Sequence, residues 1–191
     1  MKLIRLFHRQ KYMAGMLLMS LSLSAAATEE RVITQRLVVN ATAVASACRV
    51  VVEADGLGNN QLSLGVYNKA LGGEAQAKRF TLWMYEEGAT VPGCSAFMVG
   101  PHASVEFGNP GQLDDAGVMT RGAGDQVRID VRAIDEQADY RGRLNASQRA
   151  VKYPASFAAQ GQLGFEARPL NVEHASAGEY RGTLSFVVSY H

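Results

Sequence analysis

Thiol and imidazole groups are the side chains best able to do chemistry in this sequence, and they are few. The 191 residues include two cysteines, Cys48 and Cys94, and four histidines. A metal site or a reactive thiol needs further ligands or an activating neighbour, and His102 is the only histidine near Cys94. In an oxidising compartment the simplest expectation is one disulfide. Closing a loop of 94 − 48 = 46 residues would stabilise the fold by about 4 kcal/mol.

The motifs of catalysis and cofactor binding are missing from the sequence. It has no HExxH-type metal motif, no G-x-S-x-G turn and no phosphate-binding loop. Gly122-Ala123-Gly124 resembles a fragment of a nucleotide loop but lacks the glycine that would follow, so a turn is favoured. Asp114-Asp115 also favours a polar turn, because calcium needs oxygen ligands from several positions. We therefore expect no catalytic residue, no metal, no cofactor and no enzymatic activity.

The first 27 residues have the organisation of an export signal. A basic region with Lys2, Arg5, Arg9 and Lys11 precedes an apolar run at residues 13–24, and Ala25-Ala26-Ala27 supplies small residues for cleavage after Ala27. The apolar run is shorter than the roughly 20 residues that a membrane span requires. Residues 1–27 are thus predicted to be a signal peptide that is removed.

The exported chain has the length of one ordinary domain. It keeps 164 of the 191 residues, since 191 − 27 = 164, which is enough for one hydrophobic core. Loss of four basic residues changes the formal charge from +1 to −3. Nucleic acids and anionic membrane surfaces select for clustered positive charge, so neither is expected as a partner.

Short extended segments separated by glycine-rich or Asp/Asn-rich breaks dominate the exported chain, as in an antiparallel β-sandwich. The expected strands are 38–54, 61–67, 80–85, 104–107, 126–132, 163–167 and 182–190. The run 55–60 (DGLGNN) is a predicted turn, and the polar stretches 68–77 and 135–150 are each predicted to hold a short helix or a surface loop.

Alternation within the strand at 126–132 predicts which side chains are buried. Val127, Ile129 and Val131 share one parity and should face the core. Arg128, Asp130 and Arg132 share the other parity and should face water.

The two ends of the exported chain are complementary. At the C-terminus one parity carries the apolar face of a strand that ends the protein: Tyr180, Gly182, Leu184, Phe186, Val188 and Tyr190. The open edge of such a strand is a hazard that proteins normally cover. At the N-terminus Leu37, Val39, Ala41, Ala43 and Ala45 share one parity with no turn residue between them. This second segment is either the first strand of its own sheet or a strand for another subunit.

Taken together in order, these features resemble the pilus subunits of the chaperone–usher class. Members have a signal peptide, an alternating N-terminal extension, a cysteine soon after it and a second cysteine some forty residues on. They also have a penultimate tyrosine and a glycine fourteen residues from the end, here Tyr190 and Gly178. The resemblance spans the exported chain, although its middle is only generically similar.

The resemblance implies an all-β, incomplete immunoglobulin-like sandwich that lacks its final strand and has one intradomain disulfide. It divides the chain into a signal peptide (1–27), a donor-strand extension (28–46) and a pilin domain (47–191). The donor residues would be Leu37, Val39, Ala41, Ala43 and Ala45. The acceptor groove and chaperone-binding strand would include Gly178, Tyr180, Gly182, Leu184, Phe186, Val188 and Tyr190.

The function that the resemblance implies is that of a structural pilus subunit supporting adhesion. Its partners would be other pilus subunits, a periplasmic chaperone, an outer-membrane usher and, through the fibre, a host-surface receptor. It would be exported through the periplasm to the cell surface. The alternative is a secreted, single-domain immunoglobulin-like adhesin or binding protein with a complete fold.

Overall fold

The computed structural model describes residues 48–58, 60–72, 75–123 and 125–190, all within one compact unit that spans Ala43–His191. The predicted signal peptide (1–27) and extension (28–46) lie outside the described residues. So do the five proposed donor residues of the extension, Leu37, Val39, Ala41, Ala43 and Ala45.

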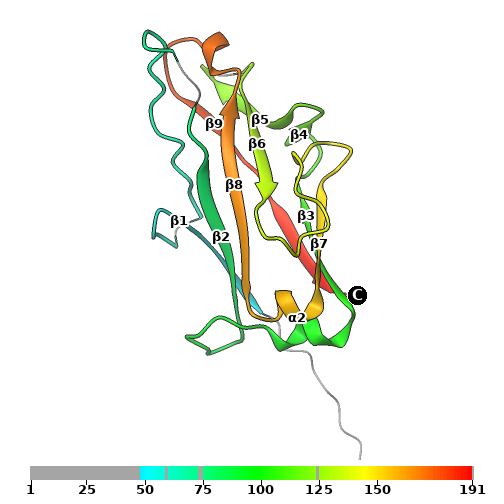
Figure 1. The fold of residues 1–191 in the computed structure, drawn as a ribbon. Helices are drawn as coiled ribbons and strands as arrows, with labels where there is room; N and C mark the ends of the chain where they lie inside the picture. The colour runs from blue at the N-terminus through cyan, green and yellow to red at the C-terminus, as the bar shows by residue number, and fades with distance from the viewer. Residues whose placement is uncertain (1–47, 59, 73–74, 124, 191) are drawn as a thin grey trace, which may run out of the picture. The chain divides into compact units, whose positions relative to one another are not determined.

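Two antiparallel sheets make up the domain (Figure 1). Its strands are β1 (Arg49–Ala54), β2 (Lys78–Tyr85), β3 (His102–Phe107), β4 (Leu113–Asp114), β5 (Gly117–Gly122), β6 (Arg128–Ala133), β7 (Ala150–Pro154), β8 (Gln162–Leu170), β9 (Tyr180–Gly182) and β10 (Phe186–Tyr190). The seven-stranded sheet has the order β1-β2-β8-β6-β5-β4, with β9 paired to β5, and the three-stranded sheet has the order β10-β3-β7. Short helices are η1 (Ser95–Val99), α2 (Ala155–Ala158) and η2 (Val172–His174).

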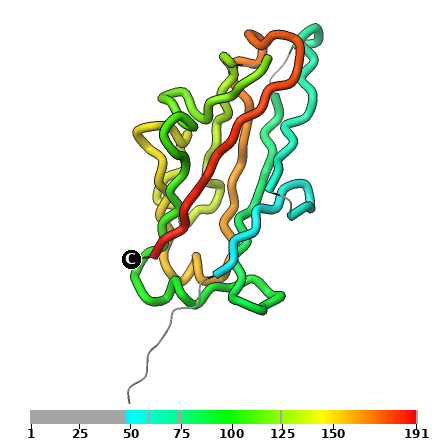
Figure 2. The backbone as a smooth tube through the Cα atoms, turned by 180° about the vertical axis from the view of Figure 1, so that it is seen from behind, coloured from blue at the N-terminus to red at the C-terminus, as the bar shows by residue number. Residues whose placement is uncertain are grey.

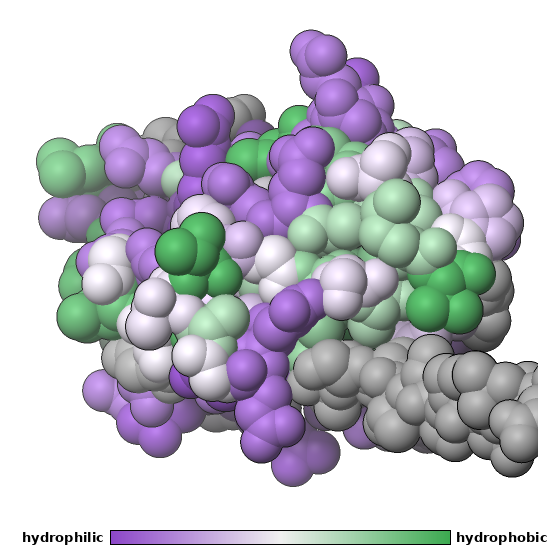
Figure 3. Space-filling model, turned by 90° about the horizontal axis from the view of Figure 1, so that it is seen from below, coloured by the Kyte–Doolittle hydropathy of each residue, from purple (hydrophilic) through white to green (hydrophobic). Residues whose placement is uncertain are grey.

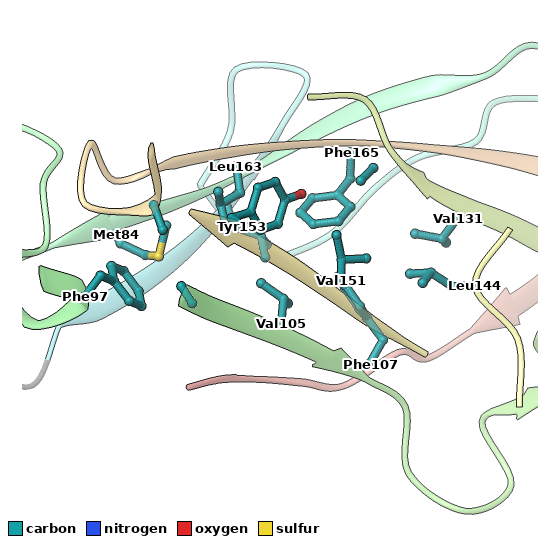
Figure 4. Packing of buried hydrophobic residues seen from close by; sticks show 14 of the residues in the cluster. Met84, Phe97, Val105, Phe107, Val131, Leu144, Val151, Tyr153, Leu163 and Phe165 are labelled. Carbon is teal, nitrogen blue, oxygen red and sulfur yellow. The ribbon is translucent and has the colours of Figure 1, made fainter. Parts of the chain in front are cut away.

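The core lies between the two sheets. Met84 of β2 and Leu163 and Phe165 of β8 enter it from the seven-stranded sheet, and Phe107 and Tyr153 enter it from β3 and β7 (Figure 4). These side chains are buried because strands alternate their side chains between faces, and each sheet turns its apolar face inward.

One disulfide joins Cys48 to Cys94, with the two Cα atoms 6.0 Å apart. It links the residue before β1 to the residue before η1. The single disulfide expected from the sequence is thus present, and it ties the edge strand β1 to the core, because Cys94 is buried.

Four of the expected strands are confirmed as β2, β3, β6 and β8, with ends that differ by a few residues. β1 covers the last part of the expected 38–54 segment, and the turn after it has positive φ at Asp55, Gly56 and Asn60. The stretch 135–150 is a loop up to β7.

The strand expected at 61–67 is wrong, because these residues belong to no strand. Gly65 has a φ of +80°, which interrupts the extended run. Leu62 and Leu64 still pack on the core, whereas Val66 is fully exposed.

The expectation that Asp130 faces water is also wrong. Asp130 is 2% exposed, and its carboxylate accepts hydrogen bonds from Arg132 at 2.7 to 3.0 Å. Arg143, from the 135–150 loop, lies 3.6 Å from the same carboxylate. The outer face of β6 is therefore covered by the loop, and the buried charge is tolerated because arginines pair with it.

The C-terminal strand expected at 182–190 is split into two. β9 pairs with β5 in one sheet, and β10 pairs with β3 in the other. At the crossover, Ser185 donates its hydroxyl and its backbone N–H to Oε1 of Gln112, and its carbonyl accepts from the N–H of Gly108. The bond to Gly108 continues the register in which Phe186 lies opposite Phe107, so Ser185 joins the β3 side as the chain leaves β9.

Candidate functional site

A groove of about 1560 Å³ opens between β1 and the β9–β10 segment. Figure 2 shows this side, with β9 and β10 in red and β1 and residues 61–70 in cyan to blue-green. Val50 and Val52 line it from β1, and Leu184 and Phe186 line it from the other wall. The groove exceeds the roughly 300–1,000 Å³ of typical small-molecule sites.

Both sheets contribute the inner lining of the groove. Its apolar side chains are Phe80, Phe107, Val118, Ile129, Val131 and Ala167. Phe107 is buried, contacting Phe165 at a ring-centroid distance of 5.1 Å and Phe186 at 5.9 Å. A chain segment that enters the groove would therefore touch the central core directly.

The β10 wall is a sheet edge. Among the strands of the described chain, β10 pairs with β3 alone, through Phe186 opposite Phe107 and Val188 opposite Val105. An edge strand turns alternate N–H and C=O groups away from its partner, in a row that can template another strand. The outward side of this wall has the backbone geometry for such pairing.

The β1 wall is an edge as well, but its own chain covers part of it. The N–H of Val52 donates to Oδ1 of Asn60 at 3.2 Å, and the N–H of Asn60 donates to the carbonyl of Val52 at 3.4 Å. Residue 60 thus occupies the place where a neighbouring strand would pair with Val52.

Two glycines shape the upper part of the β9–β10 wall. Gly178 has a φ of +142°, and a Cβ there would lie 2.9 Å from Cβ of Ala123. At Gly182, a Cβ would lie 3.0 Å from Cδ1 of Ile129. The positive φ and the close approach at Gly178 favour glycine there, whereas a Cβ at Gly182 would require Ile129 to shift; both residues line the groove.

Of the residues expected to form the acceptor surface, five line this groove: Gly178, Tyr180, Gly182, Leu184 and Phe186. Burial raises the pKa of the Tyr180 hydroxyl above its ordinary value. Val188 instead packs against the core, and the ring of Tyr190 meets Phe97 edge-on at 6.1 Å. These two residues therefore belong to the same strand but not to the groove lining.

Sequence reasoning missed the opposite wall and the inner lining. Val50 and Val52 alternate, but the continuous valine run 50–52 hides their parity. Leu62 and Leu64, assigned to a strand, line the groove from an irregular segment. No local signal could reveal Phe80, Phe107 or Ile129 as lining, because their place depends on how the two sheets pack.

Catalytic and ion-binding features do not emerge from the described residues. Nowhere in ranges 48–58, 60–72, 75–123 and 125–190 are three His, Cys, Asp or Glu side chains grouped as metal ligands. In that same part of the chain, none of the helices has the length and apolar character to cross a bilayer.

Comparison with known proteins gives the chain its family. The model of the family described as K88 fimbrial protein A matches residues 9–191. A search of curated proteins gave no match. Among solved structures, the P pilus rod subunit PapA is similar, with a TM-score of 0.50 and 14% identity over 83% of this chain and 100% of that chain. At this identity the likeness concerns the fold alone.

The fold and the family agree with each other. Two antiparallel sheets and one disulfide make a pilin-like domain, and the family match spans nearly the whole sequence. The chain belongs to the K88 fimbrial protein A family and is a structural, non-enzymatic subunit of a cell-surface fimbria that assembles with other subunits.

Proposed function

We propose that this fimbrial subunit assembles by accepting a β-strand from the next subunit into the groove between β1 and β10. The incoming strand is the 28–46 extension, with Leu37, Val39, Ala41, Ala43 and Ala45 facing inward. The observation that carries the proposal is the edge of β10 beside an apolar lining drawn from both sheets. Backbone pairing would supply affinity and the alternate side chains would supply register.

The chemistry of the extension suits the groove. Each Leu or Val side chain that leaves water contributes about 1.5–3 kcal/mol. Each new backbone hydrogen bond contributes about 1 kcal/mol. Leu37 and Val39 would be the main anchors, and the small alanines at 41, 43 and 45 would allow the strand to approach the lining closely.

Before assembly, a partner must protect the same groove. We propose that the signal peptide directs the chain to the periplasm, where a chaperone lends a strand to β10. At an outer-membrane usher the extension of the next subunit replaces that strand, and the fibre carries adhesion at the cell surface. The support is physical, because an apolar groove beside an open sheet edge promotes aggregation unless it is covered.

The proposal is tested by moving the extension within one chain. Residues 47–191 are produced in the periplasm alone or with residues 28–46 fused after His191 through a flexible linker. The fused form, called here the self-complemented monomer, should be monomeric and unfold cooperatively, whereas residues 47–191 alone should aggregate or be degraded.

A matched control carries Leu37→Asp and Val39→Asp in the fused segment. It should behave like residues 47–191 alone, because buried charges oppose insertion. If residues 47–191 alone are monomeric and as stable as the fused form, the fold needs no donor strand and the proposal is wrong.

A further inference from the structure

The end of the sandwich that contains the Cys48–Cys94 disulfide exposes large apolar side chains. This disulfide end comprises Cys48, the 86–93 loop, Cys94 and η1. Met98 is 61% exposed, Val99 72% and Val91 73%. Figure 3 views the molecule from this side and shows apolar surface interrupting the polar surface. Three exposed apolar side chains at the same end of the domain suggest a surface that a partner covers.

The opposite end, called here the far end, presents a turn at residues 68–71 (NKAL) whose large apolar residue is Leu71. Leu71 is 82% exposed, and its N–H donates to the carbonyl of Asn68 at 3.2 Å. Nζ of Lys69 donates to the carbonyl of Ala175 at 2.9 Å, which ties the turn to the segment before β9. These two bonds hold the turn that carries Leu71, and this turn lies at the end of the domain opposite η1 and α2 (Figure 1).

The direction of β10 determines which end of the donor subunit lies against which end of the acceptor subunit. β10 runs toward the disulfide end, because Tyr190 contacts Phe97 of η1 there. A donor strand that pairs with β10 in the more stable antiparallel sense runs the other way, so its Ala45 comes last, near the far end.

The segment that connects the inserted strand to the donor subunit's own domain is short. Only residues 46 and 47 separate Ala45 from Cys48. Three residue steps span at most about 11 Å at 3.3–3.6 Å each. The disulfide end of the donor subunit therefore has to sit against the far end of the acceptor subunit, with no room for a free linker.

We infer that successive copies of this chain make a second contact, in which Val91, Met98 and Val99 of the donor subunit pack on the 68–71 turn of the acceptor subunit. This contact rests on the proposed strand insertion and fixes the angle between neighbouring subunits. It buries the apolar side chains that the isolated domain exposes at both ends.

The first test uses the unmodified side chains. Fibres assembled by the chaperone and usher, and the self-complemented monomer, are treated with dilute hydrogen peroxide, and sulfoxide at each methionine is followed by mass spectrometry. Oxidation of Met98 should be at least fivefold slower in fibres than in the monomer. Met119 is the matched control, since it is 37% exposed on β5 and belongs neither to the disulfide end nor to the 68–71 turn, and its rate should not change. Equal rates for Met98 in the two forms would overturn the inference.

The second test maps the contact directly. All native cysteines of the described chain are in the disulfide, so new thiols at Leu71→Cys and Val99→Cys can be joined by a short bis-maleimide. Heated fibres of this double variant should give a ladder of covalent multimers. A Leu57→Cys, Val99→Cys control should remain mostly monomeric. Fibres that form without a ladder would contradict the second contact alone, whereas failure of the self-complemented monomer to fold would contradict strand insertion itself.

Discussion

The two strands that flank the groove, β1 and β10, are both sheet edges, but only the edge of β1 is partly covered by hydrogen bonds from its own chain. β1 is fixed by the Cys48–Cys94 disulfide just before it, and Asn60 occupies the outer hydrogen-bonding positions of Val52. β10 pairs with β3 alone among the described strands. The difference shows that an edge can be closed by its own chain, so the openness of β10 is a feature of that wall and not a general property of the fold.

The largest effect is expected from a charge on the groove side of the open wall. Phe186→Asp places a carboxylate beside Phe107, where it would be buried by an incoming strand. Burying an unpaired charge costs several kcal/mol, so fibre recovered from cells should fall at least about tenfold.

Val187→Asp is the matched control for that change, because Val187 is the next residue of β10 and is 67% exposed. It should assemble at the wild-type level. Normal fibre yield from Phe186→Asp, measured by heat-released subunits on gels, would show that this face of β10 is not the acceptor.

The stability of the domain at the β1 edge is expected to depend on the Cys48–Cys94 disulfide. Replacing both cysteines, Cys48→Ala with Cys94→Ala, should lower the free energy of unfolding of the self-complemented monomer by about 4 kcal/mol, because a 46-residue loop is released. Urea titration measures the change. The wild-type chain in reducing agent should match the variant, and a loss below about 1 kcal/mol would mean that β1 is held by packing alone.

A smaller effect is expected where Asn60 closes the β1 edge. Asn60→Gly keeps the positive φ of 58° accessible but removes the acceptor for the N–H of Val52. The free energy of unfolding should fall by about 1 kcal/mol, the usual value of one such hydrogen bond.

Asn60→Asp keeps an oxygen acceptor at the same place and should lose less than Asn60→Gly. Hydrogen exchange at the Val52 amide provides a local reading of the same bond. If the two variants are equally stable, the side chain of Asn60 does not close this edge.

The smallest effect is a pH dependence away from both edges. Burial raises the pKa of the Asp135 carboxyl, although the N–H of Gly164 donates to it at 2.7 Å. A raised pKa in the folded state favours the protonated form, so this contribution to stability is present at low pH and is lost as the pH rises through the raised pKa.

Asp135→Asn keeps an acceptor for Gly164 and does not ionise. Its melting temperature relative to wild type should therefore rise between about pH 3 and about pH 7. The self-complemented monomer and a version without the Asn60 side chain should show the same trend, because Asp135 lies outside the groove lining. A difference that is constant with pH would contradict the expected ionisation.

Sequence patterning predicted the sandwich and several of its strands because alternation is a local signal. Val127 and Val131, predicted to face inward, are buried. β5 and β7 were missed, since β5 is bounded by Gly117 and Gly122 and β7 is a five-residue strand that ends in Pro154. Glycine and proline normally indicate turns, and here tertiary pairing overrides that preference.

The parts of the site that escaped prediction depend on distant contacts. Asp130 has the parity of a surface residue, but Arg143 comes to it from a loop and covers it. The division of the C-terminus into β9 and β10 depends on Gln112, which lies 73 residues from Ser185 in the sequence. No periodicity within either segment contains that information.

The bonds between Ser185, Gln112 and Gly108 also affect the entropic cost of binding a partner strand. They anchor the start of β10 while β9 is already laid on β5, so the template strand is immobilised before any encounter. The entropy loss on docking is then mainly that of the arriving segment, and a preorganised edge of this kind lowers the total cost of binding it.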